Sequence, residues 1–170
     1  MKDSRLPADP SDLAAVVKVL EYFCQTKACS VAFLDRWLKE TKETDVRVGL
    51  TQQLVDERRH LRLLTEELRL RGIKMSAGHQ DARLTRLFEE TKALNTDLHR
   101  ICSYHRGIKA FTLNRCGALM SVVDERLSSV MDQVARDEER HIRWADIRLA
   151  RLLVHSETRD ISRFELRISE

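Results

Sequence analysis

Two copies of the motif Asp-Glu-x-Arg-His are the residues of this chain best suited to chemistry. The first copy is DERRH at residues 56–60, and the second is DEERH at residues 137–141. Each copy has a Glu and a His three positions apart, Glu57 with His60 and Glu138 with His141, so each pair lies one turn apart on one face of a helix. Two helices that each carry Glu-x-x-His into a bundle core supply half the ligands of a carboxylate di-iron site. The repeat therefore predicts a metal-type site whose remaining ligands come from elsewhere in the chain.

The two motifs fall on apolar stripes that predict four long helices. The expected helices cover about residues 11–40, 44–71, 94–119 and 124–152, with a short helix from Asp81 between the second and the third. Apolar residues recur every three or four positions in each long segment. The Glu and the His of both motifs take stripe positions where an apolar residue is expected, so they should point into the core. Ionised groups are costly to bury without a counter-charge or a metal, and we expect the motifs to share one buried site.

Length and composition favour a single all-α domain. The chain has 170 residues, which is long enough for one sizeable core. It has five Gly and two Pro, and both Pro precede the first apolar stripe, so long helices can run without interruption. We expect a four-helix bundle over residues 11–154 and a polar tail over residues 155–170. The repeat favours two helical hairpins related by a pseudo-two-fold, with a crossover at residues 73–81.

Charge and cysteine content narrow the cellular setting. A net charge of +3 is too small to indicate nucleic-acid binding by itself. The four Cys form no C-x-x-C pair and follow no signal peptide, so we expect reduced thiols in a cytoplasmic protein. No apolar run approaches the roughly 20 residues that cross a bilayer, so no membrane partner is expected.

The complete pattern resembles the ferritin-like superfamily, which includes bacterioferritins, rubrerythrins and di-iron hydroxylases. The Asp-Glu-x-Arg-His form resembles the motif of bacterial di-iron monooxygenases. The stretches DERRHLRLLTEELRLRGI and RGIKAFTLNRCGAL, the latter followed by DEERH, look more like the tRNA-hydroxylase branch, a non-haem di-iron enzyme that acts on a modified adenosine. The resemblance spans roughly residues 13–153 and implies a ferritin-like four-helix bundle, but it says little about substrate.

The resemblance also implies a role for each motif residue. Glu57 and Glu138 would be bridging iron ligands, and His60 and His141 would each bind one iron. Asp56 and Asp137 would orient the ligating histidines from behind.

The family takes two more Glu ligands from the first and third long helices, and this chain lacks them. The best register places Lys27 and Lys109 at those positions, each followed by Ala, with His105 as the alternative on the third helix. No carboxylate falls in either window. We therefore expect the two ammonium groups to replace the metals, hydrogen-bonded to Glu57 and Glu138.

A charge count supports this replacement. A working site balances four carboxylates with two divalent metals, whereas two Glu with two Lys are already neutral. Adding two metals would leave about +4 in a small volume, and at an effective dielectric of ~20 each unit repulsion at ~4 Å costs about 4 kcal/mol. We expect a degenerate site with no metal or less than one equivalent.

Three functional hypotheses stay open. The first is a metal-poor bundle with Lys–Glu pairs and a structural, binding or regulatory role. The second is a non-haem iron oxidoreductase or hydroxylase that binds one or two irons, or manganese or zinc, and acts on modified tRNA in one version. Its ligands would be Glu57, His60, Glu138, His141 and His105. The third, iron storage, is disfavoured because nothing signals a large cage. The partner would be a small molecule, a protein or RNA, and a homodimer is one expected state.

Arginines on the outer faces of the two motif helices offer a phosphate-binding surface, as an RNA substrate would require. They are Arg58, Arg62, Arg69, Arg136, Arg140, Arg143 and Arg151. Interleaved Glu residues favour an ordinary solvated face instead.

Overall fold

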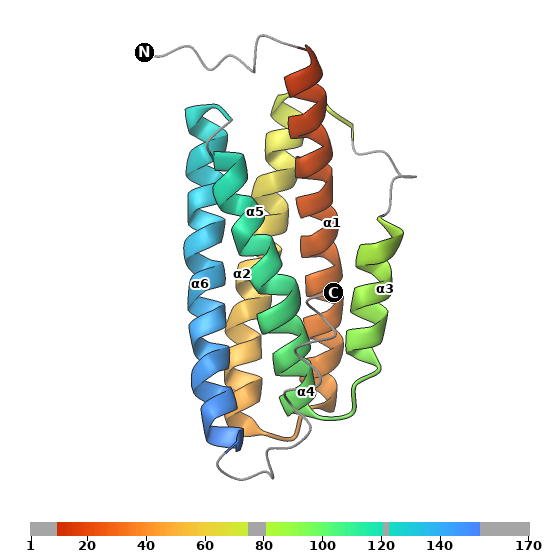
Figure 1. Ribbon diagram of the computed structural model, residues 1–170, viewed down its shortest axis with the longest axis vertical. Helices are drawn as coiled ribbons and strands as arrows, with labels where there is room; N and C mark the ends of the chain where they lie inside the picture. The colour runs from red at the N-terminus through yellow and green to blue at the C-terminus, as the bar shows by residue number, and fades with distance from the viewer. Residues whose placement is uncertain (1–9, 75–80, 121–122, 154–170) are drawn as a thin grey trace.

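The computed structural model describes residues 10–74, 81–120 and 123–153, and they form an all-helical bundle whose long helices lie side by side (Figure 1). The helices are α1 (Pro10–Glu40), α2 (Thr44–Leu70), α3 (Ala82–Lys92), α4 (Asp97–Ile101), the π-helix η1 (Cys102–Lys109), α5 (Ala110–Met120) and α6 (Glu125–Leu153). The predicted all-α four-helix bundle is confirmed. The predicted tail over residues 155–170 lies outside the described residues, so the domain boundary stays a prediction.

Two hairpins build the bundle. A short connection at residues 41–43 joins α1 to α2, and α5 packs along α6 in the same way. The first hairpin ends where the sequence predicts, because Gly72 adopts φ 68°, a left-handed conformation that favours glycine. The backbone N–H of Ile73 then reaches back to the carbonyl of Leu68 and closes the helix end.

The crossover between the hairpins carries α3, which packs against α1. Asp81 caps this helix by accepting hydrogen bonds from the backbone N–H groups of Arg83 and Leu84, so the predicted helix start at Asp81 is confirmed. The predicted start of the third long helix at Leu94 is wrong. Helix α3 ends at Lys92, and the next helix begins at Asp97, where the Thr96 side chain caps its N-terminus.

We call the four long helical segments of the bundle columns: α1, α2, the run from α4 through η1 to α5, and α6. The third column is continuous, but its winding is not uniform. The segments α4, η1 and α5 follow one another from Asp97 to Met120, and η1 is wound as a π-helix over eight residues. A π-helix changes the angular step from one side chain to the next, and such segments occur frequently at functional sites. The apolar periodicity of the sequence does not reveal this π-helix. Lys109, one of the predicted site residues, is its last residue.

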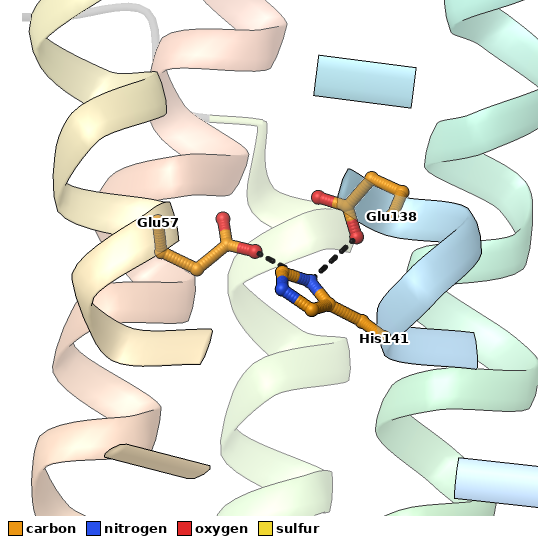
Figure 2. Close-up of side chains that lie close together, drawn as sticks. All are labelled: Glu57, Glu138 and His141. Carbon is orange, nitrogen blue, oxygen red and sulfur yellow. Dashed lines mark ion pairs between the residues drawn. The ribbon is translucent and has the colours of Figure 1, made fainter. Parts of the chain in front are cut away.

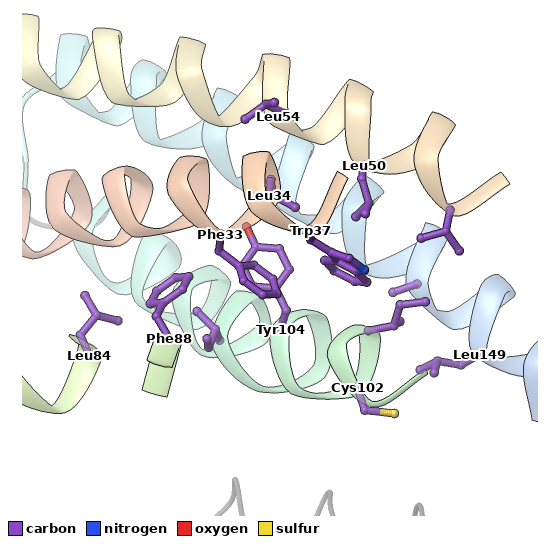
Figure 3. Close-up of a cluster of buried hydrophobic side chains, with 14 residues drawn as sticks. Phe33, Leu34, Trp37, Leu50, Leu54, Leu84, Phe88, Cys102, Tyr104 and Leu149 are labelled. Atoms are coloured by element: carbon purple, nitrogen blue, oxygen red, sulfur yellow. The ribbon is translucent and has the colours of Figure 1, made fainter. Parts of the chain in front are cut away.

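The core has three layers, two apolar and one charged. The first apolar layer gathers aromatic side chains such as Phe33, Trp37 and Tyr104 (Figure 3). The second, at the other end of the bundle, contains Leu20, Leu64 and other aliphatic residues. Each of the four columns runs from one apolar layer to the other, and between them each contributes buried polar side chains. This central charged layer is the candidate site.

None of the helices within the described ranges is long and apolar enough to cross a membrane.

Gly49 provides a test of the packing between α2 and α6. A Cβ added at Gly49 would lie 2.3 Å from the Trp144 ring, whereas one added at Gly117 in α5 would meet nothing within 4 Å. We expect Gly49→Ala to lower the free energy of unfolding by about 1–3 kcal/mol through overpacking. Gly117→Ala should instead stabilise the helix by about 0.5–1 kcal/mol. Denaturant titrations of both variants decide this, and equal stabilities would contradict the close packing.

Candidate functional site

Four fully buried charged side chains meet at the centre of the bundle, one from each column. Lys27 comes from α1, Glu57 from α2, Lys109 from η1 and Glu138 from α6, and each is at most 2% exposed. The sequence predicts all four at this place, from the phase of the motifs and from the register of the two lysines.

Each ammonium group bridges both carboxylates. The Nζ of Lys27 donates to Oε1 of Glu138 and lies 3.2 Å from Oε2 of Glu57. The Nζ of Lys109 donates to Oε1 of Glu57 and, at 2.6 Å, to Oε2 of Glu138. All four carboxylate oxygens therefore face an ammonium, and the four charges alternate in sign and sum to zero.

His141 completes the surroundings of Lys109. Figure 2 shows its ring between Glu57 and Glu138, with Nδ1 at 3.8 Å and 3.7 Å from their carboxylates. The same nitrogen lies 3.1 Å from Nζ of Lys109. His60 takes the corresponding place near Lys27, with Nδ1 at 3.9 Å from Oε2 of Glu57, which is too long for a hydrogen bond.

The aspartates of the two motifs hold the histidines across the helix interface. Nε2 of His60 lies 2.8 Å from Asp137, and Nε2 of His141 lies 3.0 Å from Asp56. A carboxylate can only accept, so each Nε2 donates to an aspartate, and an ammonium can only donate, so Nδ1 of His141 accepts from Lys109. Nδ1 of His60 has no hydrogen-bond partner within the described part of the chain.

Sequence reasoning missed the role of Arg59 and Arg140, the arginines of the two motifs. Arg140 contacts Asp56 at 2.8 Å and Asp137 at 2.7 Å, and Arg59 also reaches both aspartates. The sequence predicts Arg140 as one of the outward side chains of a possible phosphate-binding surface. It is half-exposed, but it clamps the two aspartates. The signal was present, because both copies of the motif carry Arg at this position.

His105 does not join the charged layer. Its Nε2 lies 2.8 Å from Oε1 of Gln53, and its Nδ1 lies 3.3 Å from the carbonyl of Ile101. Its ring packs edge-on against Tyr104 at a centroid distance of 4.9 Å. Burial, followed by the charge of Lys109, lowers the pKa of His105 well below its ordinary value, so the ring is neutral. The end of the π-helix brings Lys109 to the carboxylates, and His105 binds Gln53 instead.

The electrostatics of the layer favour four ionised groups. Burial alone would lower the pKa of Lys27 and Lys109, but the carboxylates of Glu138 and Glu57 raise both. Burial alone would likewise raise the pKa of Glu138, and the two ammonium groups hold it well below its ordinary value. Burial and the charge of Glu138 would also raise the pKa of Glu57, but the same two lysines lower it below its ordinary value. The layer is therefore a closed set of ion pairs at neutral pH.

The same residues contain a set of metal-ligand type. One ligand atom each from Glu57, Glu138 and His141 lie within 4.8 Å of one another. Nζ of Lys109 contacts all three side chains. An ammonium therefore stands where a metal would contact these ligands, and Lys27 stands on the opposite edge of the two carboxylates. The donor set does not fit two divalent ions while both lysines are charged.

The fold is that of a ferritin-like domain. A solved structure from Anabaena variabilis, a two-domain protein containing DJ-1/ThiJ/PfpI-like and ferritin-like domains, matches with a TM-score of 0.60 at 12% identity. The match covers 85% of this chain and 38% of that protein, so the chain spans well under half of its length. No protein-family model matches the sequence, and no curated protein matches it. The predicted ferritin-like fold is confirmed, and the tRNA-hydroxylase subtype stays a prediction.

Removal of one ammonium tests the charged layer. Lys27→Met leaves a buried carboxylate without its counter-charge, and we expect a loss of about 3–5 kcal/mol in the free energy of unfolding. The matched control is Lys39→Met on the same helix, because the Lys39 side chain is 75% exposed and should contribute little. Chemical denaturation of the two variants measures the difference. A Lys27→Met protein as stable as the parent would disprove the pairing.

Acid should weaken the contacts that Asp56 and Asp137 make with the motif histidines and arginines, which we call the aspartate clamp. Burial alone would raise the pKa of Asp56, but hydrogen bonds from His141 and Arg140 lower it, and His60 and Arg140 lower that of Asp137. A depressed folded-state pKa stabilises the protein above the ordinary Asp value of about 3.9, and this stability is lost as the pH falls through the folded-state pKa.

We therefore expect the free energy of unfolding to decline as the pH falls below about 4. Asp56→Asn should decline less steeply than the parent. Asp35→Asn is the control, since Asp35 forms solvent-exposed ion pairs with Lys39 and Arg58 and should leave the slope nearly unchanged. Parallel curves for the parent and Asp56→Asn would contradict the clamp.

Proposed function

We propose that this chain is a ferritin-like bundle of di-iron lineage in which two lysine ammonium groups take the place of two metal ions. Its role is then structural, binding or regulatory, with no metal or less than one equivalent bound. The observation that carries this proposal is that each ammonium contacts both carboxylates, Lys27 and Lys109 from opposite edges. Two divalent ions bridge a pair of glutamates in this way in a carboxylate di-iron site.

The histidines and aspartates around the four charged side chains support the proposed descent from a di-iron protein. The aspartate–histidine pairs direct Nδ1 of each imidazole towards the centre, where the nitrogen of a metal-binding histidine would be needed. That arrangement serves no obvious purpose around Lys27, where Nδ1 of His60 has no partner among the described residues. We interpret the histidines and aspartates as the remaining frame of an ancestral metal site.

A binding role fits the surface better than a reaction at the centre. Two hollows lie on the outside of the bundle, one along α2 beside Val55 and Arg62 and one between α1 and α5 beside Tyr22 and Arg115. Neither is lined by a residue of the charged layer. A partner would therefore contact the outer helix faces, and we propose a protein or a small molecule as that partner, in a cytoplasmic setting, with a homodimer as one state.

The cluster of Glu57, Glu138 and His141 supports a second candidate, a mononuclear metal protein. Such a protein would bind one iron, manganese or zinc if Lys109 left the cluster or lost its proton. An oxidoreductase or hydroxylase of the di-iron lineage belongs to this candidate. An RNA substrate is less well supported, because Arg58, Arg136 and Arg140 form ion pairs with aspartates of the chain itself.

Metal analysis separates the two candidates. We expect parent protein purified without chelator to carry well under one equivalent of iron, manganese and zinc, because its site is neutral without them. The double variant Lys27→Glu with Lys109→Glu would place four carboxylates beside two histidines and should bind two divalent ions. The control, Lys39→Glu with Lys42→Glu, makes the same change of charge at exposed positions and should bind none tightly.

Isothermal titration and elemental analysis measure both stoichiometries. One tightly bound ion in the parent favours the mononuclear candidate. Two ions in the parent would defeat the proposal.

A further inference from the structure

A hollow of about 320 Å³ lies on the outside of the bundle, where α1 meets α5 and the start of α3. Figure 1 shows α1 between α5 and α3, and α1 packs against both of them. The hollow is lined by side chains of α1 between positions 18 and 25, by Asp81 and by Arg115 of α5. Sites for small molecules begin at about 300 Å³, so this hollow has room for one compact ligand.

Two cationic side chains of the hollow have no counter-charge. Lys18 lies on α1 and Arg115 on α5, and both are exposed. Neither forms an ion pair or a side-chain hydrogen bond with another residue that the structure describes. Arg106, in the same column as Arg115, differs in this respect, because it pairs with Asp146 at 3.0 Å. The hollow therefore presents two positive charges that are open to an anion.

Aromatic rings hold the guanidinium of Arg115 in place. Its central carbon lies 4.6 Å from the centre of the Tyr22 ring and 4.5 Å from the centre of the Phe111 ring. A cation–π contact uses the charge of the guanidinium and consumes none of its five N–H donors. Arg115 is thus positioned before any ligand arrives, and its donors remain available.

The other polar groups at the start of α3 already have partners. Oε1 of Gln25 accepts from the backbone N–H of Asp81 at 2.8 Å, and its Nε2 lies 3.4 Å from the carbonyl of the same residue. The Asp81 carboxylate in turn accepts from the backbone N–H groups of Arg83 and Leu84. These bonds join α1 to the start of α3, so the walls of the hollow are fixed and its two cations are left to recognise a ligand.

We propose that this hollow binds a small organic acid, a single carboxylate on a flat apolar body. The carboxylate accepts hydrogen bonds from the guanidinium of Arg115 and the ammonium of Lys18. The apolar body lies against Val19 and Tyr22, which also line the hollow. A planar carboxylate matches the fork of a guanidinium, and removal of the apolar body from water adds to the affinity.

The charge of the lining limits the ligand to one negative charge. Glu21 and Asp81 line the hollow together with Lys18 and Arg115, so two acids stand beside the two cations. A dianion such as a phosphate monoester would be attracted by the cations, but each of its charges would also be repelled by the acids. We therefore expect the hollow to prefer a carboxylate to a phosphate on a similar body.

The inference rests on the binding role proposed above, and it names the place and the chemical class of the ligand. It does not depend on what occupies the centre of the bundle, because no residue of the charged layer lines the hollow. The two proposals can therefore fail separately.

Titration of the full-length parent with hydrocinnamate, followed by amide chemical shifts in NMR spectra, tests the proposal. We expect saturable shifts at residues 18–25, 81–84 and 111–115. The expected Kd is on the order of 1 mM, because a ligand of about eleven non-hydrogen atoms gains only modest affinity. Hydrocinnamide has the same shape without the charge and should bind at least about tenfold more weakly. Phenethyl phosphate should also bind more weakly than hydrocinnamate.

Three variants make the assignment specific. Arg115→Gln removes the guanidinium and should weaken hydrocinnamate binding by about tenfold or more. Lys18→Gln should weaken it by about two- to fivefold, since an ion pair at an exposed lysine contributes less. The control, Arg151→Gln, removes the same charge from an exposed position on α6 and should bind like the parent. All three positions are exposed, and the amide spectra show whether each variant is folded.

Hydrocinnamate that gives no saturable shifts in the folded parent would overturn the proposal. Equal affinities for hydrocinnamate and hydrocinnamide would do the same, as would tighter binding of phenethyl phosphate or an unchanged affinity of Arg115→Gln. Metal analysis of the same sample separates these results from the proposed function. No metal and no binding removes the acid site alone, whereas two bound ions with binding at the hollow removes the lysine-filled centre alone.

Discussion

The mutual compensation of two buried ammonium groups and two buried carboxylates is the interaction on which this bundle depends. Burial disfavours every one of these charges, and each is stabilised by two of the others, contributed by different helices. Because Lys27, Glu57, Lys109 and Glu138 come from four separate columns, a helix that slid or rotated would leave a charge uncompensated. We infer that this layer fixes the register of all four columns, while the apolar layers on either side exclude water from it.

The layer is nearly symmetric in its outer contacts but not in its inner ones. The outer frame repeats in both halves, with an aspartate of one motif on the histidine of the other and an arginine across both aspartates. The inner contacts differ, because Lys109 comes from a π-helix and reaches Nδ1 of His141, whereas Nδ1 of His60, on the side of Lys27, has no hydrogen-bond partner among the described residues. The half around Lys109 therefore has one contact more than the half around Lys27, which pairs with the two glutamates.

The sequence predicts the bundle, the helix ends at Gly72 and Asp81, and the inward direction of Glu57 and Glu138, since these follow from periodicity and local capping. It also places Lys27 and Lys109 beside the glutamates, through the register of a repeated pattern. It does not predict the π-helix, because the apolar periodicity of an α-helix carries no signal for a change of winding over residues 102–109. For the same reason His105 stays an open alternative until the structure pairs it with Gln53. The cross-pairing of Asp56 with His141 likewise depends on how α2 and α6 meet.

We propose that ammonium groups, and not metals, lie between Glu57 and Glu138 in the purified protein. The most direct measurement is a crystal structure of the parent protein grown with excess iron, with anomalous diffraction recorded above and below the iron absorption edge. We expect no anomalous peak between the two glutamates, and continuous side-chain density for Lys27 and Lys109 that reaches both carboxylates. An anomalous peak bridging Glu57 and Glu138, with either lysine turned away, would contradict it.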